Sequence, residues 1–319
     1  MRLSGRSIVS YLLVTLCAIA PTHAADKFTL ANGGFGLWAV EGTRIGQQAG
    51  IFAKYGVEVE VYGTAGAGET LQAVISGSAD ASVGIGTAGV FGAYAKGAPI
   101  RIFGSNFIGG GDVYFYVRTD SPVKNFSDTT TKHIISYSSA GSSSNTITLA
   151  LIEEAGVRAR AIATGDQPNT LTQVLSGQIT IGHATPPFGL KEIEEGKIRM
   201  IGTGNDAPSL RIQSTRVDMV GLRVLLERRE PFLRFVKAYR EVLDWMKSDP
   251  EAIRLWSANT GIPEERSRRA AYDFQPRSAS DHLKIGGINE IMSGAVRQKF
   301  LMQPLTTSQL EDLIQIPFY

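Results

Sequence analysis

Two segments of the sequence carry residue types and spacings that could bind an anionic group. In residues 83–92, VGIGTAGVFG, Gly84, Gly86 and Gly89 have the G-x-G-x-x-G spacing of a dinucleotide-binding turn. In residues 138–146, SSAGSSSNT, hydroxyl and backbone N–H groups gather where a helix is predicted to begin. Such a helix start favours a sulfonate, a carboxylate or a similar anion. A flexible linker has the same composition, but the position between a predicted strand and a predicted helix favours the anion cradle.

The glycine spacing does not predict a nicotinamide site. A dinucleotide turn needs an acidic residue about 20 positions after its last glycine, to hold the ribose. Here that position falls near Gly109, and the first acid after it, Asp112, lies beyond a run of three glycines. We interpret the stretch instead as one wall of a ligand cleft, where glycines let a ligand approach the backbone.

The sequence contains no recognisable catalytic motif. The only cysteine, Cys17, lies in a predicted export signal, so the mature chain has no thiol, disulfide or cysteine-based metal site. The sequence contains no H-E-x-x-H, G-x-S-x-G or Walker pattern. His183 lacks a partner signature of serine, cysteine or aspartate, and we interpret it as a polar ligand contact. We therefore predict no enzymatic activity, no cofactor and no bound metal.

Residues 1–24 have the features of a secretory signal peptide. Arg2 and Arg6 precede an apolar run at 8–20, which is too short to span a membrane, and cleavage is predicted near Ala24. We expect the mature chain in the periplasm. The chain has 32 basic and 30 acidic residues, and loss of the two arginines leaves 30 of each. This neutral balance argues against a nucleic-acid partner.

An internal repeat predicts the architecture. Residues 70–77, TLQAVISG, and 170–177, TLTQVLSG, share Thr, Leu, Val, Ser and Gly at the same offsets. Short β-branched runs alternate with helical periodicity in both copies, which predicts an α/β fold of two similar Rossmann-like lobes with mostly parallel sheets. The predicted strands are 28–31, 57–62, 81–85 and 100–103 in the first copy, and 134–137, 159–164, 179–182 and 198–201 in the second.

The predicted domain organisation follows the repeat. A signal peptide at 1–24 precedes the first part of lobe 1 at 25–106, lobe 2 at 107–204, and a return to lobe 1 with C-terminal helices at 205–319. Three successive glycines in NFIGGG, residues 106–111, favour a hinge at the first crossing. The helices that begin near Glu230 are expected to pack back on lobe 1.

Six loops are expected to surround a cleft between the lobes, because ligands in open α/β sheets bind beyond the carboxyl ends of the strands. These loops contain no Lys or Arg, so we expect dipoles rather than cations to hold the ligand. Glu69 lies in the first turn of a predicted helix, where the helix dipole stabilises a carboxylate without any ligand. The loops are 32–38, 63–69, 84–88, 138–146, 164–169 and 182–187.

Aromatic side chains near these loops could contact the apolar part of a ligand. Phe35 and Trp38 lie on the first loop, although Trp38 serves equally well as the core of the first helix. The predicted ligand-binding residues are Phe35, Trp38, Gly66, Gly68, Thr87, Ser139, Gly141, Ser142, Ser143, Asn145, Thr146, His183 and Thr185.

Residues 50–61, GIFAKYGVEVEV, resemble the G-F-F-x-K-x-G-L-x-V-x segment of periplasmic binding proteins of the nitrate, sulfonate and taurine ABC importers. That family also contains binders of thiamine-pyrimidine precursors. Residues 77–81, 121–128 and 139–145 are similar to its G-x-x-D-x turn, to the segment that opens its second lobe and to its polar second-lobe loop. The sixth loop departs from the family pattern: Ala184 and Thr185 precede its prolines where the family often has an aromatic residue or Asp.

The resemblance implies a monomer with a type II periplasmic binding fold, which closes by a hinge on a small molecule. Such a protein delivers its ligand to a membrane permease that works with a cytoplasmic ATPase. The implied ligand is a small organic anion of the sulfonate, taurine, nitrate or carboxylate class. The alternatives are a thiamine-pyrimidine precursor or another neutral heterocycle, or a lobe pair that feeds a membrane sensor. Eukaryotic relatives that make the thiamine pyrimidine use a cysteine-rich iron site, which the mature chain lacks.

Overall fold

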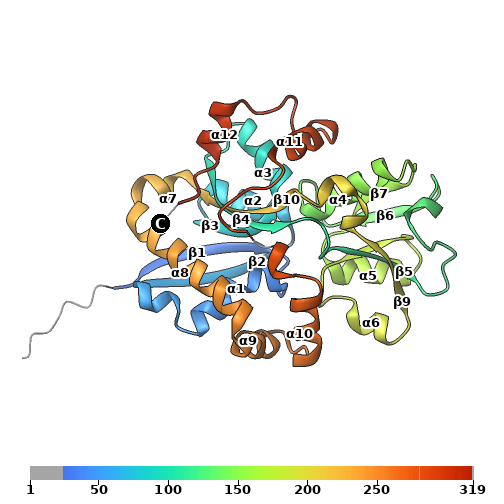
Figure 1. Ribbon diagram of the computed structural model, residues 1–319, viewed down its shortest axis with the longest axis horizontal. Coiled ribbons are helices and arrows are strands. Elements are labelled where there is room, and N and C mark those ends of the chain that lie inside the picture. Colours follow the sequence, from blue (N-terminus) through green and yellow to red (C-terminus); the bar gives the residue numbers. More distant parts are fainter. Residues whose placement is uncertain (1–23, 280, 318–319) are drawn as a thin grey trace, which may run out of the picture.

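The computed structural model describes residues 24–279 and 281–317, so the predicted signal lies outside the described residues except for Ala24. Two α/β lobes lie side by side, one around the strands at the left of Figure 1 and the other around those at the right. Among the described residues, none of the helices combines the length and the apolar character needed to span a bilayer.

The sheet of lobe 1 has the order β2–β1–β3–β10–β4. Strands β1, β2 and β3 are parallel, whereas β10 runs antiparallel to both β3 and β4. The sheet is therefore mixed, and its one antiparallel strand returns from the other lobe. The strands are β1 (Asp26–Gly33), β2 (Val57–Thr64), β3 (Ala81–Gly86), β4 (Ile100–Ile108) and β10 (Ser214–Gly221).

Lobe 2 repeats this arrangement. Strands β6 and β7 are parallel, β5 runs antiparallel to β8 and β9, and a bridge between Ile135 and Ile181 joins the two groups. The combined order β7–β6–β8–β5–β9 matches that of lobe 1, with β5 in the place of β10. The predicted pair of similar lobes is confirmed. The strands are β5 (Tyr114–Arg118), β6 (Ile134–Tyr137), β7 (Arg160–Ala163), β8 (Gly182–Ala184) and β9 (Ile198–Thr203).

The two copies of the repeat share a hydrogen bond as well as a strand order. The hydroxyl oxygens of Thr64 and Thr70 are 2.5 Å apart, and those of Thr164 and Thr170 are 2.7 Å apart. Thr70 and Thr170 also donate to the carbonyl oxygen four residues earlier, at 3.0 and 2.9 Å. Each bond ties the end of a strand to the helix that follows it, α2 (Ala67–Ser76) or α5 (Gln167–Leu175).

Strands β5 and β10 are the elements that the sequence did not reveal. Each enters one lobe from the other and pairs on both sides, so its residues are almost all buried. The sequence of β10, STRVDMVG, is rich in polar residues and lies outside the strands predicted from the sequence. The sheets are mostly parallel, as predicted, and the antiparallel exceptions are the two strands that connect the lobes.

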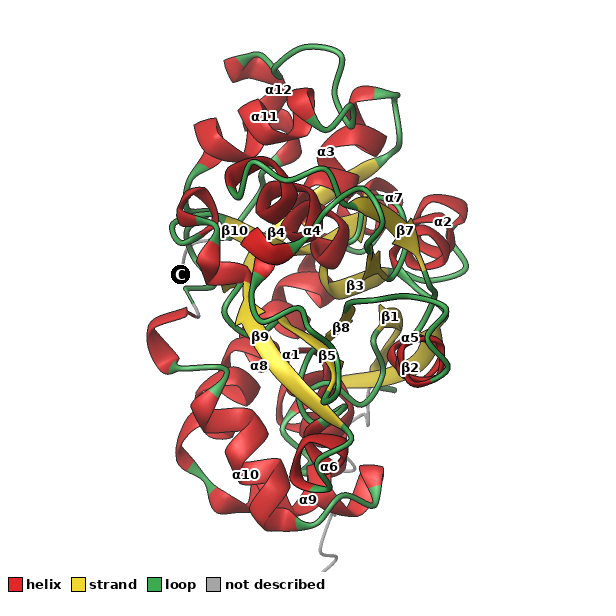
Figure 2. Ribbon diagram, turned by 90° about the vertical axis from the view of Figure 1, so that its right-hand side faces the viewer, coloured by secondary structure: helices red, strands yellow, loops and turns green. Residues whose placement is uncertain are grey.

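Helices cover both faces of the lobe 1 sheet, with α8 and α9 on one side and α3, α11 and α12 on the other (Figures 1 and 2). The 3.6-residue spacing of apolar side chains in α8 buries Phe232, Phe235, Tyr239 and Met246 against α1 and the sheet. The helices are α1 (Trp38–Gln48), α2 (Ala67–Ser76), α3 (Thr87–Ala95), α4 (Ser143–Glu154), α5 (Gln167–Leu175), α6 (Leu190–Glu194), α7 (Leu222–Glu227), α8 (Arg229–Ser248), α9 (Pro250–Thr260), α10 (Glu264–Asp273), α11 (Ile288–Arg297) and α12 (Thr307–Leu313).

The C-terminal helices pack on lobe 1 as expected, and two of them also contact lobe 2. Arg266 of α10 forms an ion pair with Glu194 of α6 at 2.7 Å. Arg297 of α11 forms another with Glu153 of α4 at 2.9 Å. The tail therefore spans both lobes on two sides.

The lobes touch where glycines face each other. A Cβ atom on Gly89 would lie 2.6 Å from the carbonyl oxygen of Gly141, and one on Gly86 would meet the same oxygen. Gly84 has a backbone φ of +71°, a left-handed conformation that glycine adopts easily because it has no Cβ atom. The glycine stretch that we interpreted as a ligand wall thus also provides backbone-to-backbone contact between the lobes.

Replacing Gly89 by alanine tests this contact, with Gly294→Ala as the matched control. Both glycines lie inside helices, where alanine contributes up to about 1 kcal/mol of stability, but a Cβ atom at Gly294 meets nothing within 4 Å. We expect Gly294→Ala to raise the free energy of unfolding in urea. Gly89→Ala should lose that gain and give the small-angle scattering of a more open molecule. Equal gains and identical scattering would contradict the contact.

Candidate functional site

A cavity of about 410 Å³ lies between the lobes, a size that suits a small organic molecule. Each of the six loops expected around the cleft contributes to its wall. One lining residue from each loop, in chain order, is Phe35, Gly66, Ile85, Ser143, Gln167 and Thr185. The position of the cleft therefore agrees with the rule for open α/β sheets.

The predicted ligand-binding residues divide into two groups by position. The first group lines the cavity: Phe35, Gly66, Ser142, Ser143, His183 and Thr185. The second group lies outside its lining: Trp38, Gly68, Thr87, Ser139, Gly141, Asn145 and Thr146. Ligand binding stays a prediction for the first group, and we no longer propose direct contact for the second.

Residues of the second group serve the fold. The ring of Trp38 is buried in the core, with its centroid 4.9 Å from that of Trp256. The side-chain oxygen of Asn145 accepts a hydrogen bond from the backbone N–H of Gly141 at 3.1 Å, and both residues are buried. The hydroxyl of Thr87 donates to a carbonyl oxygen of β10 at 2.5 Å. Substitution of these residues would therefore disturb packing before it disturbed a ligand.

Three further positions lie outside the cavity lining, and two of them lie at contacts between lobe 2 and the rest of the molecule. Ser139 of lobe 2 faces Gly66 of lobe 1, whose Cβ would lie 3.0 Å from the serine hydroxyl oxygen. The carbonyl oxygen of Thr146 accepts a hydrogen bond from Gln298 of the C-terminal segment at 3.2 Å. Gly68 lies exposed in the first turn of α2. Ser139 and Thr146 thus mark places where lobe 2 meets the rest of the molecule.

The serine-rich loop presents backbone N–H groups to the cavity more than hydroxyl groups. Ser142 caps α4, because its Oγ accepts a hydrogen bond from the N–H of Asn145 at 3.1 Å. The Oγ of Ser144 accepts another from the N–H of Ser138 at 3.0 Å. The N–H groups of Ser143 and Ser144, at the start of α4, have no acceptor within the helix. They are the donors that this loop can offer to an anion.

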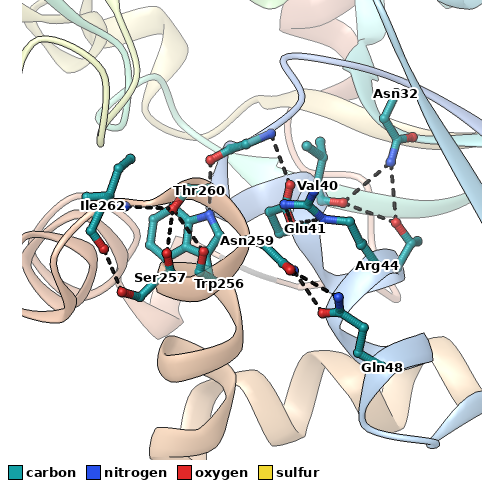
Figure 3. Close-up of polar contacts among 12 residues, drawn as sticks. Asn32, Val40, Glu41, Arg44, Gln48, Trp256, Ser257, Asn259, Thr260 and Ile262 are labelled. Atoms are coloured by element: carbon teal, nitrogen blue, oxygen red, sulfur yellow. Dashed lines mark hydrogen bonds and ion pairs between the residues drawn. The ribbon is translucent and has the colours of Figure 1, made fainter.

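A network of polar contacts fixes the loop that carries Phe35 (Figure 3). The N–H of Gly36 donates to the Glu41 carboxylate at 3.0 Å, and the carbonyl oxygen of Gly36 accepts from the indole N–H of Trp256 at 3.0 Å. Arg44 pairs with Glu41 at 2.8 Å and places its guanidinium 4.6 Å from the centre of the Phe35 ring. Burial raises the pKa of Glu41 against the effect of Arg44. These contacts hold the aromatic ring at the cavity.

A buried cation also lines the cavity, so the expectation of a cleft without cations is wrong. Arg216 of β10 forms two hydrogen bonds with the carboxylate of Asp112, at 2.7 and 3.0 Å. Its Nε donates to the hydroxyl oxygen of Ser143 at 3.1 Å. Both charged side chains are buried. Arg216 was missed because it lies on a crossing strand rather than on one of the six loops.

His183 offers the cavity a neutral hydrogen-bond donor. Its Nδ1 lies 2.8 Å from the hydroxyl oxygen of Ser136, which also accepts from the His183 backbone N–H at 2.8 Å. In the tautomer in which the serine hydroxyl donates to Nδ1, the ring proton lies on Nε2. Burial lowers the pKa of His183 to about 4, so the ring is uncharged at neutral pH.

Metal binding finds no support in the part of the chain that the structure describes. Within residues 24–279 and 281–317, no group of three or more His, Cys, Asp or Glu side chains is placed to hold a metal ion. The cavity instead combines helix-start N–H groups, one neutral imidazole and one compensated ion pair with aromatic and aliphatic walls.

Residues 40–253 match the family model described as NMT1/THI5 like, and the match covers more than half of the chain. The chain belongs to the NMT1/THI5-like family. A comparison with curated protein sequences gave no match. The family assignment agrees with the resemblance found in the sequence.

Solved structures share the fold of this NMT1/THI5-like protein at low sequence identity. The alkanesulfonate-binding protein SsuA from Xanthomonas axonopodis pv. citri, bound to MOPS, is 14% identical with a TM-score of 0.74, covering 92% of this chain and 100% of that chain. The aliphatic sulphonate binding protein SsuA from Escherichia coli is 14% identical, with a TM-score of 0.70 and coverage of 92% and 93%. The nitrate-binding protein NrtA from Synechocystis PCC 6803 is 15% identical, with a TM-score of 0.68 and coverage of 91% and 86%. The chain therefore has the fold of periplasmic binding proteins.

A buried carboxyl group lies behind the cavity wall of the NMT1/THI5-like protein. The Oδ1 of Asp218 on β10 accepts hydrogen bonds from the N–H of Gly84 at 2.9 Å and from the amide of Asn106 at 3.1 Å. Gly84 itself lines the cavity. Burial raises the pKa of Asp218 to about 7 despite these two donors.

The raised pKa of Asp218 makes the stability of the folded state dependent on pH. The folded protein holds this proton up to about pH 7, whereas an ordinary carboxyl group loses it near 3.8. Stability from this group is therefore lost as the pH rises through that window. Between pH 4 and pH 8 the wild type should therefore lose about 3–4 kcal/mol of unfolding free energy that the variant Asp218→Asn keeps.

Urea unfolding of both proteins across this pH range measures the difference. His183 and His282, whose pKa values burial lowers to about 4, titrate in both proteins and cancel in the difference. Parallel pH profiles for the two proteins would mean that Asp218 is ionised in the folded state throughout.

Proposed function

We propose that this protein is the periplasmic solute-binding component of an ABC importer. It captures one small organic molecule between its lobes and delivers it to a membrane permease that works with a cytoplasmic ATPase. The observation that carries the proposal is the cavity of about 410 Å³, to which loops of both lobes contribute. A solute that contacts both lobes favours the closed form over the open one, which couples binding to recognition by the permease. The sulfonate-binding and nitrate-binding proteins that share the fold support this role.

The first candidate solute is a small organic anion of the sulfonate, taurine, nitrate or carboxylate class. The N–H groups of Ser143 and Ser144 and the Nε2–H of His183 would hold its anionic head. The rings of Phe35 and Phe188, which also line the cavity, would contact its body. Dipoles at a helix start can hold an anion without a free counter-charge.

The second candidate is a neutral polar heterocycle, such as a thiamine-pyrimidine precursor. The ion pair favours it, because the carboxylate of Asp112 compensates the charge of Arg216. Asp166 adds a further carboxylate to the cavity wall. A neutral ring with both donors and acceptors could use Asp166, Thr185 and the backbone groups together.

The predicted signal peptide supports a periplasmic location, and the resemblance to binding proteins supports a monomer. A lobe pair that feeds a membrane sensor would need the same closing cavity. Genes for a permease and an ATPase beside the gene for this chain would favour import. A neighbouring histidine kinase gene would favour sensing.

A thermal-shift screen tests the solute classes. The panel contains alkanesulfonates, taurine, nitrate, aliphatic and aromatic carboxylates, and pyrimidines, each at millimolar concentration. A solute at one hundred times its Kd stabilises the folded state by about 2.7 kcal/mol, which raises the melting temperature measurably. We expect members of one class to give this rise, and a class with no rise is excluded.

Filling the cavity tests whether it is the binding site. Ala67 lines the cavity at the start of α2, whereas Gln72 is exposed on the same helix and does not line it. We expect Ala67→Phe to fold, by circular dichroism, but to lose the thermal response to the solute found in the screen. Gln72→Phe should keep that response. Wild-type binding by Ala67→Phe would place the solute elsewhere.

A further inference from the structure

The carboxylate of Asp112 lies where the carboxylate of a solute would bind Arg216. Each terminal nitrogen of the guanidinium donates to a different oxygen of Asp112, at 2.7 and 3.0 Å. This is the two-point geometry in which arginine binds free carboxylates and similar anions. Nε of Arg216 is engaged by Ser143 at 3.1 Å, and the guanidinium lies 5.2 Å from the centre of the Phe107 ring.

Among the described residues, Arg216 is the only Lys or Arg that lines the cavity. Asp112 and Asp166 line it too, and His183 is neutral because burial lowers its pKa to about 4. An anion that enters meets helix-start dipoles but no uncompensated cation. Compact anions such as nitrate or formate have no body for the aromatic walls to hold, so they depend most on a cation.

We propose that Asp112 is a specificity-determining residue of the solute site. By occupying the guanidinium of Arg216, it keeps compact monoanions out of the cavity and reserves the site for solutes with an organic body. The inference rests on the proposed solute-binding function and narrows its solute class. Within the organic-anion candidate, it favours sulfonates and carboxylates with an apolar part over nitrate.

The pair also predicts what happens when only one partner is removed. Asp112→Ala leaves a buried guanidinium without its counter-charge, which destabilises the folded state. The same substitution opens a space of carboxylate size beside Arg216. Formate can enter that space and restore the lost ion pair, so the variant should regain stability as formate is added.

The experiment measures the melting temperature of the full mature chain against formate and nitrate concentration at constant ionic strength. We expect a saturable rise for Asp112→Ala, with an apparent Kd for formate at least tenfold lower than for wild type. Asp120→Ala is the matched control, because Asp120 also pairs with an arginine through both oxygens, at 3.0 and 2.6 Å, but lies exposed on the surface. It should respond as wild type does. The double variant Asp112→Ala/Arg216→Met should lose the response.

The inference is overturned if Asp112→Ala binds formate no better than wild type, or if the double variant responds equally. Should Asp112→Ala fail to fold, Asp112→Asn keeps the side-chain shape and opens no space, but it leaves the charge of Arg216 at the cavity wall uncompensated. The same tenfold criterion then applies to nitrate, which would bind in the cavity beside that charge. The probes are formate and nitrate alone, so the result does not depend on finding the natural solute. A screen in which no solute stabilises the wild type would count against the proposed function and leave the result for Asp112 intact.

Discussion

The buried ion pair between Arg216 and Asp112 ties together the two places where the chain crosses between the lobes. Asp112 lies in the first connection, just before β5, and Arg216 lies on β10, which follows the second. Either charge would be costly to bury alone. The two connections therefore have to remain side by side for the pair to form, and Ser143 of lobe 2 joins the same cluster. The ion pair holds the two connections next to each other.

Some of the contacts between the lobes are made with little side-chain bulk. Gly89 meets Gly141 through the backbone, and Gly66 meets the side chain of Ser139. Backbone contacts of this kind bury little apolar area, so they contribute little to holding the lobes closed. A solute that contacts both walls would add to the free energy that favours closure, which is the condition for a population shift driven by binding.

The parts of the fold that follow the repeat could be predicted from the sequence, and the connecting strands could not. Helices α2 and α5 share the pattern of residues 70–77 and 170–177, and glycine stops mark the loops of the cavity. Strand β10 contains four polar residues, Ser214, Thr215, Arg216 and Asp218. Polar side chains in a buried strand need hydrogen-bond partners, and the sequence does not show those partners. The alternation of polar and apolar residues in TRVDMV was the signal that could have found it. Because the strand was not predicted, Arg216 was not predicted as a cavity residue. The hydrogen-bond partners of Asn145 and Thr87 are distant in the sequence or on the backbone, so only the structure shows them.

The compensation of the Arg216 charge by Asp112 affects how the protein would release its solute as well as how it would capture it. In the proposed carrier role, the protein must give its solute up to the permease, and a two-point contact between a buried arginine and an anion would be slow to break. Arg216 makes that contact with Asp112 of the protein instead. The solute is left with the N–H groups of α4, the imidazole of His183 and the aromatic wall. The contacts to α4 and His183 come from lobe 2 and the contact to Phe35 comes from lobe 1, so opening the lobes would leave the solute with weak contacts to one lobe only. A site without a free cation therefore suits a protein that must release its solute each time it opens.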